Sequence, residues 1–295
     1  MNLTLPAGVR LDTGRGGLPR LSIANDICAA ELYLYGAHLC HWQPRTQAHP
    51  VLWMSGESQY AVGRPIRGGV PICFPWFGSK AGDPSAPGHG VARINLWTLE
   101  AATLEADGTV VVRLSLTSGT HARPLVPYDF RLAHELRLGR TLSMAFTVTN
   151  QGDAPITFEE ALHTYLTVGD VRRVRVEGLA GAAYVDKVDG MKRKTQPDEP
   201  ITVSAETDRL YLDTETAATL TDPDFGRAIR VTKAGSRSTV VWNPWIAKSK
   251  AMPDFGDEEW PGMICIETAN AADNALTLAP GARHTMTASL SVAAA

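Results

Sequence analysis

Two segments of the chain carry a histidine and a glutamate where strand alternation would place them among side chains of one face. In residues 156–166, His163 shares a face with several polar side chains, and in residues 262–270, Glu267 follows two apolar side chains on its face. A histidine gains or loses a proton near neutral pH, and a half-buried carboxylate needs a partner or a catalytic role. Both residues are therefore candidates for acid–base chemistry. A hydrogen-bonded structural histidine and an ion-paired acid are the alternatives.

Arginines occur beside glycines in two further segments. Arg67 precedes a pair of glycines within residues 63–78, and His89 stands between two glycines within residues 87–93, which end at Arg93. Glycine permits a close approach of backbone and ligand, and two guanidinium groups could bind a phosphate through a fork of N–H donors. The alternative is a buried hairpin in which Arg67 caps a carbonyl group, beside a loop histidine and a surface arginine.

The elements that must position these residues are short strands. Period-two alternation recurs along the chain, separated by turn signals such as Asp107-Gly108 and Gly139-Arg140. The alternating runs cover residues 20–26, 109–119, 131–139, 142–150, 172–179, 228–233, 238–244, 262–270 and 285–294. Helical periodicity is almost absent. This pattern predicts an all-β fold, a large two-sheet antiparallel β-sandwich, with residues 1–295 forming a single domain.

Composition narrows the class of protein. The formal net charge is -3 and hydrophobic residues make up 44% of the 295 residues, as in an ordinary globular protein with a large core. A chain without a basic excess is not expected to bind nucleic acid or an anionic membrane. There is no secretory h-region and no apolar run long enough for a membrane span. The four cysteines are scattered, which predicts reduced thiols and a cytoplasmic protein.

Several familiar chemistries lack their motifs. The sequence contains no phosphate loop, no nucleophile elbow and no zinc-binding helix motif. Cys40 and His41 are adjacent and would need distant partners to bind zinc, so we expect no metal and no cofactor. An acidic cluster is expected to be a solvated loop; it consists of Asp254, Asp257, Glu258 and Glu259.

Six pieces of the sequence, in order, resemble the glucose-6-phosphate 1-epimerases, or hexose-6-phosphate mutarotases, of the aldose 1-epimerase group. They are IRGGVPICFPWFG, HGVAR, HTYL, AAYVDKVDG, VVWNPW and DFGDEEWPGMICIETAN. The resemblance extends from about Asn25 to about Thr285. It implies the galactose-mutarotase-like super-sandwich, in agreement with the strand pattern, and interconversion of the α and β anomers of a hexose 6-phosphate.

The resemblance also implies roles for single residues. His163 of HTYL and Glu267 of CIETAN match the catalytic histidine and carboxylate. Anomerisation removes a proton from the C1 hydroxyl group while another group protonates the ring oxygen. A histidine and a carboxylate on opposing strands can supply this acid and this base without a cofactor.

Residues that contact the substrate follow from the same resemblance. Arg67 of IRGG and Arg93 of HGVAR match the phosphate-contacting arginines, Asp186 of YVDK matches a sugar-contacting aspartate, and His89 matches a histidine that helps to hold the ring. The family often has glutamine before that histidine, whereas this chain has Gly88. One substrate hydrogen bond, and with it the sugar preference, is therefore open.

Three other functions compete with this interpretation. A mutarotase for unphosphorylated sugars would not need two arginines, and a glycosidase would use a pair of carboxylates. A sugar-binding β-sandwich without turnover would use exposed tryptophans such as Trp76, Trp97 or Trp245. We expect a monomeric enzyme whose partner is a small-molecule sugar phosphate.

Overall fold

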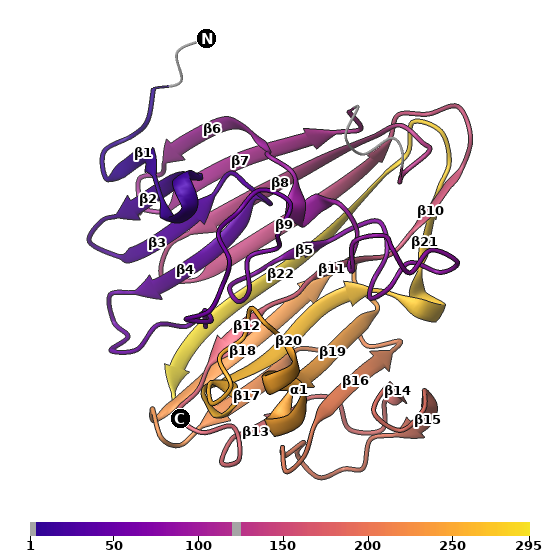
Figure 1. The fold of residues 1–295 in the computed structure, drawn as a ribbon. Coiled ribbons are helices and arrows are strands. Elements are labelled where there is room, and N and C mark those ends of the chain that lie inside the picture. The colour runs from indigo at the N-terminus through magenta and orange to yellow at the C-terminus, as the bar shows by residue number, and fades with distance from the viewer. Residues whose placement is uncertain (1–3, 120–124) are drawn as a thin grey trace.

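The computed structural model of the chain describes residues 4–119 and 125–295. It consists mainly of antiparallel strands, among which are two sheets of eight strands each (Figure 1). The predicted all-β, two-sheet sandwich is therefore confirmed. Within the described residues, no helix is long and apolar enough to cross a membrane.

The first large sheet carries the candidate catalytic residues. Its strands, in spatial order, are β15 (Lys192–Thr195), β14 (Ala183–Asp186), β16 (Thr207–Leu212), β19 (Ser238–Asn243), β20 (Met263–Asn270), β11 (Glu160–Leu162) and β5 (Ile72–Cys73). The eighth strand, β12 (Tyr165–Thr167), also pairs with β20.

The second large sheet contains most of the long strands. In spatial order they are β13 (Arg175–Glu177), β17 (Ala218–Asp222), β18 (Arg227–Ala234), β22 (Arg283–Ala294), β9 (Leu142–Asn150), β8 (Phe130–Leu138), β7 (Val110–Thr117) and β6 (Thr98–Leu104). Every second residue of β8 and β9 is buried, as their alternating sequences predict.

Smaller elements surround the two large sheets. A four-stranded sheet near the N-terminus comprises β1 (Val9–Thr13), β2 (Pro19–Ala24), β3 (Cys28–Tyr33) and β4 (His38–Pro44), and β10 (Ile156–Phe158) pairs with β21 (Leu276–Leu278) (Figure 1). The α-helix of the described chain is α1 (Trp245–Ala251), and short 3-10 turns lie at Arg15–Gly17, Ala92–Ile94, Trp260–Gly262 and Ala272–Asn274.

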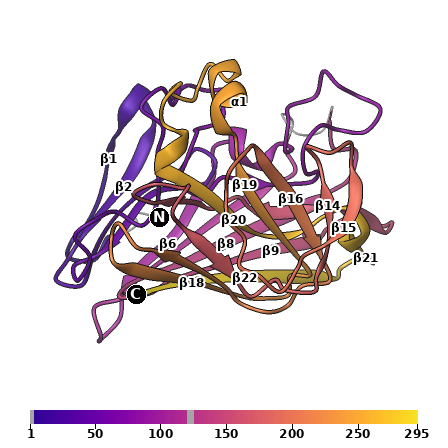
Figure 2. The ribbon, with the colours of Figure 1, turned by 90° about the horizontal axis from the view of Figure 1, so that it is seen from below.

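The two large sheets stack face to face, with α1 and several loops on the outer side of the first sheet (Figure 2). All eight residues of β20 are buried because the second sheet covers one of its faces and these loops cover the other. Burial of a large apolar side chain contributes roughly 1.5–3 kcal/mol. A strand that is anchored in this way holds its outward-facing polar side chains in fixed positions.

The segment 156–166, which alternation predicts to be one strand, is divided into β10, β11 and β12. The break after β10 lies at Glu159, whose carboxylate accepts hydrogen bonds from the backbone N–H groups of Phe77 (2.8 Å) and Ala272 (2.7 Å). The second break lies at His163 and Thr164. There the backbone N–H of His163 donates to the Pro71 carbonyl oxygen, outside the pairing with β20.

Candidate active site

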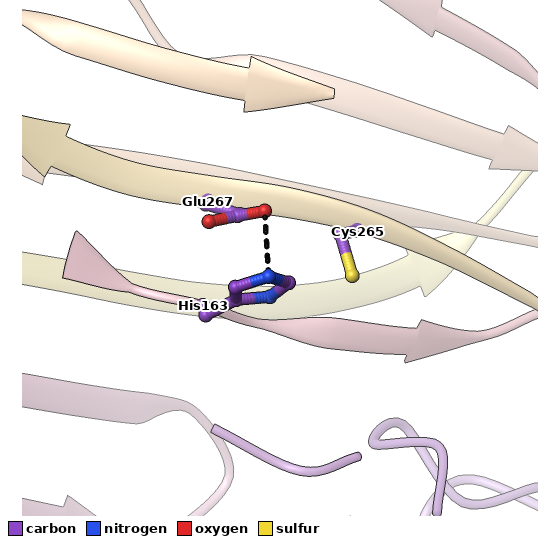
Figure 3. Close-up of side chains that lie close together, drawn as sticks. All are labelled: His163, Cys265 and Glu267. Carbon is purple, nitrogen blue, oxygen red and sulfur yellow. Dashed lines mark ion pairs between the residues drawn. The ribbon is translucent and has the colours of Figure 1, made fainter. Parts of the chain in front are cut away.

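His163 and Glu267 face each other across two neighbouring strands. β12 and β20 pair in the register that sets Tyr165 opposite Cys265, and β11 continues the same register on the other side of the break. This register puts His163 opposite Glu267. The His163 Nε2 and Glu267 Oε1 atoms are 3.3 Å apart (Figure 3).

Both groups of this pair are buried. His163 is 6% exposed and Glu267 is 1% exposed. Burial raises the pKa of the Glu267 carboxyl group well above its ordinary value and lowers the pKa of the His163 imidazole well below its own. The uncharged forms are thus favoured, with the shared proton on Glu267. Neither oxygen of the Glu267 carboxyl group has a hydrogen-bond partner among the described residues, so the group is open to hydrogen bonds with a ligand.

A second histidine lies beside the pair. The His89 ring centroid is 5.5 Å from that of His163, and burial lowers the pKa of His89 well below its ordinary value. Its Nδ1 atom accepts a hydrogen bond from the Gly78 N–H and lies 3.3 Å from the Cys73 thiol. The neutral ring must therefore carry its proton on Nε2, which leaves that N–H available as a donor.

The position of His89 depends on the glycine that follows it. Gly90 has a φ of +80°, and a Cβ atom there would lie 1.9 Å from the Phe74 carbonyl oxygen. No larger residue fits without displacing the backbone. Gly90 therefore serves the tight packing of the loop, whereas Gly88 has room for a Cβ atom and offers its carbonyl oxygen to Arg93 at 2.7 Å.

Arg67 is connected to the catalytic pair through Tyr165. Its NH1 group donates to the Tyr165 hydroxyl (2.9 Å), and its NH2 group donates to both carboxylate oxygens of Asp254 (3.1 Å each). The Tyr165 ring in turn stacks on His163. The Arg67 guanidinium group therefore does not cap a carbonyl group alone. The Tyr165 side chain lies between it and the imidazole of His163.

Arg93 is a buried arginine rather than a surface one. It is 8% exposed, and burial lowers its pKa from the ordinary value. Its Nε atom has no hydrogen-bond partner among the described residues. The positive charge of Arg93 lowers the pKa of both His89 and His163, and of Glu267 as well. The second arginine therefore acts on the same centre as the histidines.

The structure does not bring Asp186 to this centre. In the first sheet, Asp186 pairs with Arg209, which pairs with Val241, which pairs with Ile266. Directly paired residues point to one face of a sheet, and successive residues point to opposite faces. Because Ile266 precedes Glu267, Asp186 lies on the face away from the catalytic pair.

The carboxylate of Asp186 has local partners instead. It accepts hydrogen bonds from the backbone N–H groups of Val188 (3.1 Å) and Asp189 (3.2 Å) and from the Lys194 ammonium group (2.8 Å). These contacts fix the turn after β14. The structure thus places Asp186 apart from the pair of His163 and Glu267, and its contact with a sugar stays a prediction.

Two residues that the sequence did not single out, Lys187 and Asp208, lie on the same face of the sheet as Glu267. Lys187 places its Nζ atom 4.4 Å from the centroid of the Phe77 ring and 3.5 Å from the Asp208 Oδ1 atom. Burial raises the pKa of Asp208 above its ordinary value, while Lys187 lowers that of Glu267. Alternation along the extended chain separates Asp186, the last residue of β14, from Lys187, but it does not reveal which face holds the site.

The acidic loop is only partly solvated. Asp257 and Glu258 are exposed, as expected. Asp254 binds Arg67, and Glu259 accepts hydrogen bonds from the Ser55 hydroxyl (2.8 Å) and from two backbone N–H groups. For these two acids the expectation is wrong, because their carboxylates close the loop over the segment that leads to Arg67.

The tryptophans proposed for a sugar-stacking protein are not exposed. Trp76 is 9% and Trp97 is 2% exposed, and both donate their indole N–H to a carbonyl oxygen. Trp245 is half-buried and packs against Trp260, with ring centroids 4.2 Å apart. Their burial weakens the interpretation of the chain as a sugar-stacking protein.

A third side chain that could bind a metal ion, Cys265, lies next to the pair of His163 and Glu267. The Cys265 thiol projects from the same face of β20 as Glu267, and the ligand atoms of His163, Cys265 and Glu267 all lie within 4.8 Å of one another (Figure 3). Unlike the adjacent Cys40 and His41, His163 is distant in the sequence from Cys265 and Glu267, and the three come together only through the pairing of β20 with its neighbours.

A two-sheet antiparallel sandwich with a buried histidine–glutamate pair on its outer face is the setting of a sugar epimerase, and the family comparison agrees. The chain belongs to the aldose 1-epimerase family, whose sequence model matches residues 19–291. It is 37% identical over 244 residues to an Escherichia coli K12 protein named as a proposed glucose-6-phosphate 1-epimerase, covering 83% of this chain and 80% of that protein.

Two further relatives agree with this placement. A Cenchrus ciliaris protein named in the same way is 33% identical over 262 residues, which cover 86% of this chain and 78% of the relative. The crystal structure of a proposed mutarotase from Salmonella typhimurium superimposes with a TM-score of 0.88 and 29% identity, covering 97% of both chains. The family named in the sequence analysis is thereby confirmed.

Proposed function

We propose that the chain interconverts the α and β anomers of a hexose 6-phosphate, with glucose 6-phosphate as the substrate, by acid–base ring opening and closure. The observation that carries the proposal is the buried pair of His163 and Glu267, 3.3 Å apart, with two arginines beside it. Names of relatives that refer to glucose-6-phosphate 1-epimerase support the same substrate.

The reaction needs one proton on the pair. Hydrogen bonds from sugar hydroxyl groups to Glu267 favour its ionised form, and the proton then resides on His163. Glu267 takes the proton of the C1 hydroxyl group while His163 protonates the ring oxygen, and the bond between C1 and the ring oxygen breaks. The open chain rotates about C1–C2, and closure reverses both transfers. Each positioned proton transfer contributes roughly 10²–10⁴-fold to the rate.

The remaining residues divide between the ring and the phosphate group. His89 offers its Nε2–H, and Asp208 offers a carboxylate, to the sugar hydroxyl groups. Arg67 and Arg93 provide the guanidinium groups for the 6-phosphate, and Lys187 adds a third positive charge on the same face. Three cations beside one centre favour an anionic substrate over a neutral sugar.

The cellular setting is part of the proposal. All four cysteines are buried free thiols, which is typical of a protein in a reducing compartment such as the cytoplasm. We propose that the enzyme acts there as a monomer on a small-molecule substrate.

Magnetisation-transfer NMR of glucose 6-phosphate, with and without the protein, tests this function directly. We expect catalysed exchange between the anomers, undiminished by a chelator. Exchange that is lost in chelator and restored by a divalent ion would contradict the cofactor-free mechanism. Exchange of free glucose that equals that of glucose 6-phosphate would favour a mutarotase for unphosphorylated sugars, and no exchange of either sugar would favour a binding protein.

A further inference from the structure

The thiol of Cys265 has no part in the proposed proton transfers, yet it stands at the centre of the site. It belongs to β20 two residues before Glu267, so both side chains project toward His163 (Figure 3). All three residues are buried, and their ligand atoms lie within 4.8 Å of one another.

The donor set matches one class of metal ion. Nitrogen, sulfur and oxygen donors bind Zn²⁺ tetrahedrally at about 2.0–2.3 Å, which places neighbouring donors roughly 3.3–3.6 Å apart. The separation of His163 Nε2 and Glu267 Oε1 is 3.3 Å, the length of such an edge. Mg²⁺ and Ca²⁺ require more ligands, and those ligands are oxygens. A thiol beside an imidazole selects a soft or borderline ion instead.

We propose that His163, Cys265 and Glu267 form a binding site for a thiophilic divalent cation, Zn²⁺ or Cd²⁺, and that the bound ion inhibits the enzyme in competition with the sugar. The ion replaces the protons of the Cys265 thiol and the Glu267 carboxyl group, both of which leave to solvent. The thiolate and the carboxylate then balance the two positive charges of the ion. The group of ion and ligands stays neutral beside the positive charges of Arg67, Arg93 and Lys187.

Inhibition follows from the identity of the ligands. With an ion on the Nε2 atom of His163 and on an oxygen of Glu267, neither group can exchange a proton with the sugar. Inhibition rests on the proposed function, whereas metal binding does not. The experiment therefore measures the two separately.

Direct binding is measured with Co²⁺ as a spectroscopic probe on the full-length protein after treatment with chelator. We expect one Co²⁺ per chain, a thiolate-to-cobalt charge-transfer band, and displacement by Zn²⁺. Cys265→Ala should abolish the band and weaken Zn²⁺ binding by more than about tenfold, the order of loss seen even for partners outside the ligand shell. Cys28→Ala, which removes another buried thiol, is the matched control and should keep the band.

Turnover is measured on the same samples. Zn²⁺ should inhibit wild type, chelator or excess sugar phosphate should relieve this inhibition, and Cys265→Ala should retain turnover while losing its sensitivity. Circular dichroism shows whether the variant is folded, and Cys265→Ser serves if alanine leaves a damaging cavity. Co²⁺ binding without a thiolate band, or equal Zn²⁺ sensitivity in the folded variant, would overturn the site. A wild type that binds Co²⁺ through the thiolate but lacks turnover would contradict only the proposed function.

Discussion

The ring of Tyr165 lies nearly parallel to the imidazole of His163, with centroids 4.8 Å apart and planes inclined by 12°. The hydroxyl group of the same tyrosine accepts a hydrogen bond from the Arg67 guanidinium at 2.9 Å. One side chain thus fixes the orientation of the proposed acid and of an arginine assigned to the phosphate. The spacing of two residues along the extended chain makes this possible, because His163 and Tyr165 point to one face.

Replacement of this tyrosine tests the connection. Tyr165→Phe keeps the stacked ring and removes the acceptor of Arg67, so kcat/KM for glucose 6-phosphate should fall roughly tenfold, the lower end for a hydrogen bond to a charged group. Most of the loss should appear in KM, since the ring still orients His163. Tyr33→Phe removes a hydroxyl group that accepts from the Arg15 backbone N–H and should leave both parameters unchanged. A loss confined to kcat would mean that the hydroxyl group serves the chemistry instead.

The catalytic pair gives a second prediction. Glu267→Gln preserves shape but removes the base, and His163→Asn removes the acid. Each should lower kcat by roughly 10²–10⁴-fold with a much smaller change in binding. The double variant should be little worse than the single ones, because the two groups act in one exchange. Glu177→Gln alters an exposed glutamate on β13 and provides the control. Near wild-type turnover in both single variants would leave only a binding function.

His163 and Glu267 could each be singled out from the sequence as acid–base candidates because alternation places them on mixed or half-buried faces, and their pairing was implied by the family resemblance. The face of Glu267 is set by the apolar residues before it, and β20 is a strand as predicted, although all eight of its residues are buried. What the sequence could not show is the register between β11, β12 and β20, which sets His163 opposite Glu267. Long-range pairing depends on contacts between segments about a hundred residues apart, and local alternation carries no information about it.

The same limit applies to Asp186 and to the acidic loop. Alternation separates Asp186 from Lys187, but only the pairing of β14 through β16 and β19 to β20 shows which of them shares the face of Glu267. For a related reason, the sequence does not show that part of the acidic loop is paired. Asp254 resembles any surface acid until the fold brings Arg67 to it from a distant part of the chain.

A third prediction concerns stability and involves Lys233 on β18. Its ammonium group donates to the Thr214 and Thr239 hydroxyl groups and to the Ser238 carbonyl oxygen, all of them uncharged. Burial lowers the pKa of Lys233 from 10.5 to about 7. Between these values the unfolded chain binds one more proton than the folded chain, so this residue makes the free energy of unfolding rise with pH.

Replacement of Lys233 isolates its contribution to the pH dependence of the free energy of unfolding. From pH 7 to pH 9, wild type should gain stability relative to Lys233→Met, measured by urea unfolding at each pH. Lys192→Met alters a lysine with a 69% exposed side chain. Its free energy of unfolding should change with pH in the same way as that of wild type. A constant difference between wild type and Lys233→Met across this range would show that the lysine keeps its ordinary pKa in the folded state.

The last prediction separates a phosphorylated from a neutral substrate. Arg67 and Arg93 approach the catalytic face from different loops, and each acts on the pKa of His163 through its charge. Their cost to the fold is considerable, because a buried guanidinium group with an unpartnered Nε–H is unfavourable. An anionic ligand that accepts from both groups would offset this cost.

If the 6-phosphate is that ligand, the effect on kcat/KM of removing either arginine must differ between phosphorylated and free sugar. Arg67→Ala or Arg93→Ala should lower kcat/KM for glucose 6-phosphate roughly 10–100-fold, the value of a hydrogen bond to a charged group. Slow turnover of free glucose should hardly change, because it has no phosphate to lose. Lysine at either position should restore only part of the lost kcat/KM for glucose 6-phosphate, since it keeps the charge but lacks the planar pair of N–H donors. Arg113→Ala, at a 52% exposed side chain, controls for nonspecific charge effects. Equal losses on both sugars would mean that the two arginines hold the fold rather than the phosphate, because a structural defect does not distinguish one substrate from the other.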